Sequence, residues 1–263
     1  MDLELTGRHV LVTGGSRGIG LACAQAFLRE GAQVSIVGRN PQHLEDAEHT
    51  LRQVPGARVA GFCADLRDAA AALAMVEAVE SRVGPIDVLV NSAGAALRTP
   101  FAELEPAAWQ AAMQAKFFTY VHVMDPVVKR MGARGRGAIV NVVGMGGKVP
   151  SRTHLAGGAA NAALMLASAG LAAAYGPQGV RINAVNPSST LTDRLAQGMA
   201  AEARLRQLSA QEVLRQATAQ VPLGRLAAPQ DVADLVVFLC SPRAAYVSGA
   251  IVAIDGASSP MVV

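Results

Sequence analysis

The chain has 263 residues, of which 51% are hydrophobic, 16% charged and 4% aromatic, and its formal net charge is +3. The apolar fraction is enough for one sizeable core and excludes a disordered chain. A charge of +3 over this length, with no basic stripe interleaved with aromatic residues, argues against nucleic-acid binding. Composition therefore indicates a globular protein that does not bind nucleic acid.

Cysteine usage and the N-terminus indicate the compartment. The three cysteines lie far apart, without a C-x-x-C or Cys/His cluster, so we expect reduced thiols and no metal site. The N-terminus lacks the basic start and apolar run of a signal peptide. The apolar run from Ala162 to Tyr175 is shorter than a membrane span. We therefore expect a cytoplasmic protein that does not bind a membrane.

Strand and helix signals alternate along the chain. Continuous apolar runs predict buried parallel strands at His9–Thr13, Val34–Val37, Arg58–Cys63, Ile86–Val90, Ala138–Val143, Arg181–Val185 and Ile251–Ile254. Helical spacing predicts helices at Gly18–Arg29, Leu44–Leu51, Ala69–Arg82, Ala107–Met131, Leu155–Tyr175 and Gln230–Leu239. The alternation predicts a doubly wound α/β fold, in which helices cover both faces of a seven-stranded parallel sheet.

One segment interrupts the alternation. From about 190 to 225 two helical stretches follow each other with no strand between them, which predicts a lid-like insertion over a ligand site. We find no linker or low-complexity segment, so we expect residues 1–263 to form a single domain.

A glycine-rich loop, Thr13-Gly14-Gly15-Ser16-Arg17-Gly18-Ile19-Gly20, follows the first predicted strand and opens the first helix. Its glycines permit a tight turn and let the backbone approach a pyrophosphate. The free N–H groups and positive dipole end of the helix then favour the phosphate charge. The loop therefore predicts a dinucleotide-binding site.

The end of the second strand indicates which dinucleotide is preferred. An acid there would bind the ribose 2′-OH of NAD, but this chain has Gly38 followed by Arg39 and no acid until Glu45. Arg17 lies in the glycine loop itself. Guanidinium groups make bidentate contacts with phosphates, so Arg17 and Arg39 favour the 2′-phosphate of NADP(H). The alternative is that both arginines are simply solvated.

Further motifs follow along the chain. They are Asp65-Leu66, Asn91-Ser92-Ala93-Gly94, Arg181-Ile182-Asn183-Ala184-Val185-Asn186-Pro187, Thr192, Pro222-Leu223-Gly224-Arg225, Val247-Ser248-Gly249 and Ile254-Asp255-Gly256. With the glycine loop, they resemble the short-chain dehydrogenase/reductase family over nearly the whole chain. Ser92 and Ser188 depart from the family pattern, which has Asn and Gly there.

The resemblance implies a Rossmann-type fold and an NADP(H)-dependent oxidoreductase acting on a carbonyl or alcohol. It also implies a homo-tetramer in which long helices pair across a two-fold axis. The dinucleotide-binding residues that it implies are Thr13, Gly14, Ser16, Arg17, Gly18, Ile19, Gly20, Arg39, Asp65, Leu66, Asn91, Ala93, Gly94, Asn161, Pro187 and Thr192.

The family's catalytic set is replaced in this register. Gly144 stands at the position of the serine, Gly157 at that of the tyrosine, Asn161 at that of the lysine and Lys116 at that of the helix asparagine. Glycine can neither orient a carbonyl nor donate a proton. Lys116 and Asn161 also look like an exchange of two side chains between facing helices; the alternative is drift after catalysis was lost.

Two side chains could replace the tyrosine as proton donor. His154 lies one helical turn before Gly157, and histidine is a competent acid near neutral pH. Lys116 would serve if its pKa were lowered. We therefore expect catalysis by Lys116, His154 and Asn161. The alternative is a catalytically silent dinucleotide-binding protein, either a sensor or an inactive subunit of a hetero-oligomer with an active relative.

Overall fold

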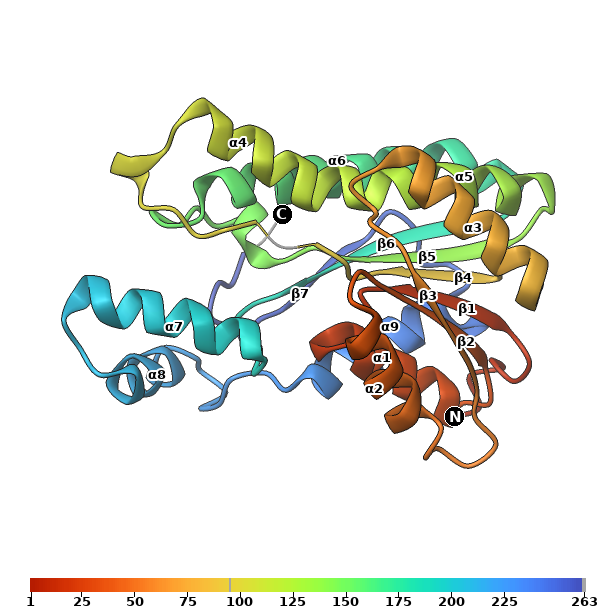
Figure 1. Cartoon of the computed structure of the whole chain (residues 1–263), viewed down its shortest axis with the longest axis horizontal. Coiled ribbons are helices and arrows are strands. Elements are labelled where there is room, and N and C mark those ends of the chain that lie inside the picture. The colour runs from red at the N-terminus through yellow and green to blue at the C-terminus, as the bar shows by residue number, and fades with distance from the viewer. Residues whose placement is uncertain (95, 262–263) are drawn as a thin grey trace.

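A computed structural model describes residues 1–94 and 96–261. Its central sheet has seven parallel strands in the order β3-β2-β1-β4-β5-β6-β7 (Figure 1). The strands are β1 (His9–Thr13), β2 (Gln33–Gly38), β3 (Arg58–Cys63), β4 (Val88–Asn91), β5 (Gly137–Val142), β6 (Val180–Pro187) and β7 (Ile251–Ile254). The strand order reverses between β1 and β4, and ligands of such sheets bind beyond the carboxyl ends of the strands at this point.

Helices cover both faces of the sheet, which confirms the predicted fold class. On one face lie α1 (Gly18–Arg29), α2 (Pro41–Leu51) and α9 (Pro229–Cys240); on the other lie α3 (Ala69–Val83), α4 (Pro106–Ala112), α5 (Thr119–Ala133) and α6 (Leu155–Tyr175) (Figure 1). Buried valines, leucines and alanines form a core on each face. β1, β4 and β5 are buried along almost their whole length, as continuous apolar runs require.

The helix predicted over Ala107–Met131 is interrupted. It consists of α4, a π-helical turn at Met113–Phe118, and α5. Such turns cannot be seen in a hydrophobic pattern and are frequent at functional sites. This one contains Lys116, which is only 7% exposed.

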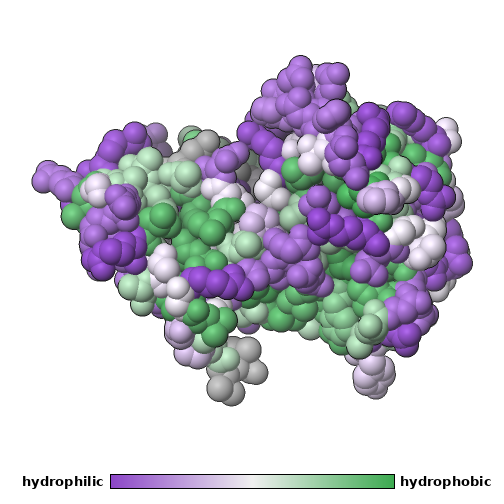
Figure 2. Space-filling model, turned by 90° about the horizontal axis from the view of Figure 1, so that it is seen from below, coloured by the Kyte–Doolittle hydropathy of each residue, from purple (hydrophilic) through white to green (hydrophobic). Residues whose placement is uncertain are grey.

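The predicted insertion consists of α7 (Asp193–Arg206) and α8 (Ala210–Ala219), which lie to one side of the sheet (Figure 1). A parallel bridge between Thr190 and Ala227 closes it at its base. Seen from below, this side of the molecule shows apolar residues bordered by hydrophilic ones (Figure 2). The exposed large apolar side chains among the described residues of this segment include Leu191, Leu214 and Leu223.

Helix α6 is longer than the apolar run recognised in the sequence. Over Leu155–Gln178 it is long and apolar enough to cross a membrane by length and composition. Half of its most apolar window is buried inside the protein, however, and its buried side chains include Leu164, which packs with Tyr120 and Val143. Its apolar character is thus that of a helix packed on a core.

Candidate active site

The predicted dinucleotide residues gather at one edge of the sheet. They lie at the carboxyl ends of β1, β2, β3, β4 and β6, in the loops that follow those strands, or at the starts of α1 and α7. Asn161 is the exception, since it lies on α6. This edge, at the switch point of the strand order, is where a ligand of a doubly wound sheet binds.

The glycine loop is packed so closely that side chains are excluded from it. Gly14 has φ +68° and its N–H donates to Val37 O at 2.9 Å. A Cβ at Gly14 would lie 2.8 Å from the Ala93 backbone, and one at Gly20 would overlap Gly14 O. The glycines therefore let α1 begin directly against the β1 turn, with its first N–H groups facing the carboxyl edge.

A buried polar chain joins the strand ends to α6. Thr13 Oγ1 accepts from the N–H groups of Ser92 and Ala93 and donates to Asn91 Oδ1 at 3.3 Å. Asn91 Nδ2 donates to Asn141 Oδ1 at 3.0 Å, and Asn141 Nδ2 donates to Ser168 Oγ at 2.8 Å. These bonds fix β1, β4 and β5 relative to one another below the site. Thr13 and Asn91 thus have structural partners here.

The end of β2 is basic. Arg17 and Arg39 are both exposed, and Asn40 caps α2 by accepting from His43 N at 3.1 Å. Asp65 forms an ion pair with Arg67, whose hydrogen bonds, together with the nearby charge of Arg39, hold the pKa of Asp65 at about 2. Arg39 therefore lies within electrostatic reach of one carboxylate, Asp65, which is already engaged by Arg67.

The insertion contacts the loops of the sheet through its first turn. Thr192 caps α7 by accepting from Leu195 N at 3.3 Å, and its Cγ2 lies 3.3 Å from the place of a Cβ at Gly18. Arg194, two residues on, donates to Gly94 O at 3.1 Å and to Ala96 O at 3.3 Å. The structure thus brings Thr192 to the glycine loop and ties α7 to the loop that follows β4.

Lys116 lies at the end of β5. Its Nζ donates to Val142 O at 3.1 Å and to Tyr120 Oη at 2.9 Å, and Tyr120 Oη donates to the same carbonyl at 2.5 Å. Burial, and secondly the charge of Arg194, lower the pKa of Lys116 to about 7. A buried amine with this pKa can both hold and release a proton near neutral pH.

His154 occupies the space left by Gly157. A Cβ at Gly157 would overlap the imidazole and would lie 2.6 Å from its Nε2. Burial, followed by the charges of Arg98, Arg194 and Lys116, lowers the pKa of His154 to about 4. The ring is therefore neutral at pH 7, and its buried Nδ1 has no hydrogen-bond partner among the residues that the structure describes.

Asn161 faces Gly144, as the sequence register requires. Its side chain is 5% exposed, and Nδ2 lies 3.3 Å from the place of a Cβ at Gly144. The buried Oδ1 has no hydrogen-bond partner within 1–94 and 96–261. An orphaned buried acceptor is costly unless a ligand donates to it, so Asn161 suits a polar ligand with hydroxyl groups.

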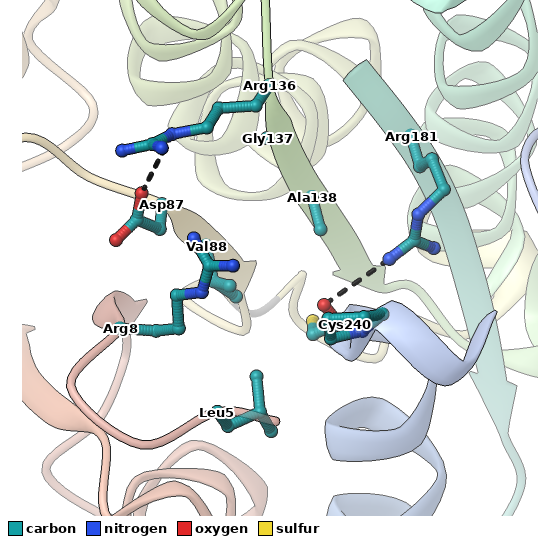
Figure 3. Close-up of a pocket in the computed structure, with 10 residues that line it drawn as sticks. Leu5, Arg8, Asp87, Val88, Arg136, Gly137, Ala138, Arg181 and Cys240 are labelled. Atoms are coloured by element: carbon teal, nitrogen blue, oxygen red, sulfur yellow. Dashed lines mark hydrogen bonds and ion pairs between the residues drawn. The ribbon is translucent and has the colours of Figure 1, made fainter. Parts of the chain in front are cut away.

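Cavities lie both beside this site and far from it. One, of about 200 Å³, lies next to His154 and is lined by Gly146, Gly147, Lys148, Pro150, Leu155, Gly158, Ala159 and Ala162. A second, of about 140 Å³, lies at the amino ends of the strands (Figure 3). There Arg136 pairs with Asp87, and Arg181 donates to four backbone carbonyls, including that of Cys240, which is the role of a structural side chain.

Some side chains around the site were not recognised from the sequence. Tyr120 lies one turn beyond Lys116, and nothing in the sequence shows that its hydroxyl shares Val142 O with Lys116. Arg98 and Arg194 come from loops and from the insertion, and no pattern in the sequence shows that they approach His154. In the described part of the chain no three His, Cys, Asp or Glu residues are grouped as metal ligands.

Comparison with known proteins agrees with this geometry. Residues 14–258 match the family described as Enoyl-(Acyl carrier protein) reductase. A D-threitol dehydrogenase from Mycolicibacterium smegmatis is 36% identical over 260 residues, which cover 97% of this chain and 94% of that protein.

Two solved structures extend the comparison. The L-sorbose reductase of Gluconobacter frateurii, complexed with NADPH and L-sorbose, has a TM-score of 0.90 at 31% identity. An NADPH-bound short chain oxidoreductase of Pseudomonas aeruginosa PAO1, described as containing an atypical catalytic center, has a TM-score of 0.88 at 33% identity. In both cases the match covers 97% of this chain and 98% of the other. The chain belongs to the short-chain dehydrogenase/reductase family.

Proposed function

We propose that the protein is an NADP(H)-dependent oxidoreductase that interconverts a carbonyl and an alcohol with a non-standard catalytic set. The observation that carries this proposal is Lys116, a buried amine whose pKa is about 7, held at the end of β5 beside the dinucleotide edge. The NADPH-bound relative with an atypical catalytic center supports a departure from the usual set within this family.

The residues present fit a nicotinamide dinucleotide. The glycine loop excludes side chains, so its backbone and the first turn of α1 can be approached by a pyrophosphate, and the orphaned Oδ1 of Asn161 suits a ribose hydroxyl. We assign the contacts to Thr13, Gly14, Ser16, Arg17, Gly18, Ile19, Gly20, Arg39, Asp65, Leu66, Asn91, Ala93, Gly94, Asn161, Pro187 and Thr192. The dinucleotide supplies the hydride.

Arg17 and Arg39 favour NADP(H) over NAD(H). They stand where an acid would bind the ribose 2′-OH of NAD, and guanidinium groups match a phosphate. The relatives by themselves leave both choices open, because a 7α-hydroxysteroid dehydrogenase in the same set of structures holds NADH. We expect tighter binding of NADPH than NADH, and a reversed preference in Arg39→Asp; equal affinities in the unmodified protein would contradict the assignment.

In the proposed reaction, Lys116 donates a proton to the substrate oxygen as the carbonyl carbon accepts the hydride, and it recovers the proton in the reverse direction. The ammonium is oriented by Val142 O and Tyr120 Oη. His154, which is neutral at pH 7, orients the carbonyl from the place that a tyrosine would take at position 157. Lys116 is thus a better proton donor than His154, whose pKa is too low.

Three further properties belong to the proposal. The chain is a single domain with a lid, it assembles as a homo-tetramer, and it works in the cytoplasm on a small molecule. A hetero-oligomer with an active relative is the alternative assembly. The named relatives act on threitol and sorbose, which are a polyol and a ketose. We extend to this chain only the carbonyl or alcohol function that they share.

Turnover of a panel of ketones and quinones with NADPH tests the proposal. Enzymatic oxidation of NADPH above background, lost in Lys116→Met, is the expected result. Arg204→Met is a suitable control because Arg204 is exposed at the far end of α7. Saturable binding of NADPH without turnover of any compound would instead favour a silent dinucleotide-binding protein, which the absence of side chains at Gly144 and Gly157 makes the second candidate.

A further inference from the structure

Three cationic side chains lie close enough to His154 to lower its pKa. They are Arg98, in the loop that follows β4, Lys116, in the π-helical turn, and Arg194, in the first turn of α7. All three charges lower the pKa of His154, after the effect of burial. Arg194 also lowers the pKa of Lys116, so the charges lie close enough to repel one another.

Hydrogen bonds and close packing hold these segments together. Thr99 N donates to Thr153 O at 3.0 Å, which fixes the loop of Arg98 beside His154. Arg194 donates to Gly94 O, and a Cβ at Gly94 would lie 2.9 Å from Thr119 Oγ1 on the helix that carries Lys116. The loop after β4, which carries Arg98, therefore contacts the segments that carry His154, Arg194 and Lys116.

Arg98 also lies against α7. Its Nε is 3.4 Å from the place of a Cβ at Gly198, one helical turn beyond Arg194. The Arg98 guanidinium thus lies against the face of α7 that carries Arg194. Arg194 donates one N–H from each terminal nitrogen to Gly94 O and Ala96 O, and its remaining N–H groups, together with those of Arg98, match one planar anionic group.

Among the described residues, no carboxylate forms an ion pair with these three side chains. The ion pairs formed within residues 1–94 and 96–261 include neither Arg98, Lys116 nor Arg194. Lys116 is 7% exposed, and a buried charge without a partner is costly. A ligand of opposite sign would remove that cost.

The phosphates of the dinucleotide do not account for the cluster. Their sites are the first turn of α1 and the arginines at the end of β2, whereas the cluster lies at the ends of β4 and β5 and at the starts of α6 and α7. β2 and β5 lie on opposite sides of β1 and β4 in the sheet. The cluster is thus at the substrate end of the site.

We propose that the substrate is a carbonyl compound with an anionic group, and that Arg98 and Arg194 bind this group while Lys116 faces the carbonyl. A carboxylate is the simplest group that can accept hydrogen bonds from both guanidinium groups. This inference rests on the proposed oxidoreductase function, because it names the substrate class of the same site.

The test uses a series of 2-, 3-, 4- and 5-oxo carboxylic acids, each paired with its neutral primary amide. Turnover is measured with NADPH, and binding by calorimetry on protein saturated with NADP⁺. We expect the best acid to exceed its amide by about tenfold to a hundredfold in kcat/KM or affinity, which is the effect of charge-assisted hydrogen bonds. The preference should fall as salt is added.

Two variants and a control locate the effect. Arg98→Met and Arg194→Met should each reduce the preference for the acid at least tenfold, and Arg98→Met should leave the Kd of NADPH unchanged. Arg204→Met, which removes an exposed arginine from the same helix, should leave both unchanged. If the two variants bound NADPH more weakly but kept the preference for the acid over its amide, the arginines would belong to the dinucleotide site, and the inference would be wrong.

The inference and the proposed function fail in different ways. If neutral carbonyl compounds were turned over at least as well as the acids, the oxidoreductase function would stand, but the proposal of an anionic substrate would be wrong. Binding of an acid over its amide, lost in Arg98→Met, without any turnover would support the anion site and contradict the oxidoreductase function.

Discussion

Lys116 shows how burial changes the chemistry of a single side chain. Its ammonium is desolvated at the end of β5, donates to a carbonyl and a hydroxyl and lies 4.6 Å from the centre of the Tyr120 ring, and it forms no ion pair with a carboxylate among the described residues. Desolvation and the lack of such an ion pair both favour the neutral amine. The same residue on a solvated helix face would remain charged and would be unable to give up its proton near pH 7.

The pKa of Lys116 predicts a pH dependence of stability. Its pKa is about 7 in the folded protein and near 10.5 in the unfolded chain, so the unfolded chain binds more protons between these values. Stability from this group therefore rises with pH in that window. Urea unfolding between pH 7.5 and 9.5 should show the free energy of unfolding rising by about 1.4 kcal/mol per pH unit relative to Lys116→Met. Parallel curves for both proteins would contradict the assigned burial.

Tyr120 tests whether a tyrosine outside the usual position acts as the acid. Burial raises the pKa of its hydroxyl, which already donates to Val142 O. We expect Tyr120→Phe to cost about 1 kcal/mol of stability through the lost hydrogen bonds, while turnover stays within about tenfold.

Tyr175→Phe and Tyr246→Phe are the matched controls for this change. Tyr246 is fully exposed, and Tyr175 ends α6 far from Lys116, so both should retain turnover within about tenfold. Abolished turnover in any of the three variants, with Lys116→Met and His154→Ala silent, would mean that the catalytic register is wrong.

At the scale of elements, the glycine loop depends on the contact between its first and last members. A Cβ at Gly20 would overlap the carbonyl oxygen of Gly14, so Gly20→Ala must push α1 away from the β1 turn. We expect NADPH affinity to fall at least tenfold, because the N–H groups of α1 would no longer meet the pyrophosphate. Fluorescence titration with NADPH measures this.

Gly170→Ala is the control for that substitution. Gly170 lies inside α6, and a Cβ there meets nothing within 4 Å. Alanine favours a helix interior over glycine by about 1 kcal/mol, so this variant should bind NADPH as the unmodified protein does without losing stability. If Gly20→Ala and Gly170→Ala bound NADPH with equal affinity, the assignment of the glycine loop to the dinucleotide site would be wrong.

The elements themselves were largely readable from the sequence. Strands such as His9–Thr13 and Arg58–Cys63, and helix Leu155–Tyr175, have the predicted bounds, because continuous apolar runs and helical spacing directly reflect burial. The π-helical turn around Lys116 was missed, since it changes hydrogen bonding and not hydrophobicity. The approach of Arg98 and Arg194 to His154 was missed because it depends on how α7 is tied to the loop after β4.

At the scale of the whole molecule, an unpaired apolar surface favours assembly. Leu166 on α6 is 77% exposed, and Leu73, Trp109 and Phe118, on the same face of the sheet, are each about 40% exposed. Exposed large apolar side chains on one face of a molecule favour an interaction surface. We expect a second copy of the chain to cover it, in a homo-tetramer.

Light scattering at micromolar concentration measures this assembly. We expect the mass of a tetramer for the unmodified protein and a smaller mass for Leu166→Glu, since a buried carboxylate is strongly disfavoured at an interface. Leu214→Glu, on α8 of the insertion, is the control and should keep the tetramer. A monomeric mass for the unmodified protein would contradict the expected assembly.

The most direct measurement of the central claim is isotope transfer from NADPH deuterated at C4, in both stereoisomers, to a reducible carbonyl. Mass spectrometry of the alcohol product should show one deuterium from one of the two isomers, and product formation should fall at least a hundredfold in Lys116→Met, which is within the range of losing a general acid. No transfer from either isomer by protein that binds NADPH would contradict the account.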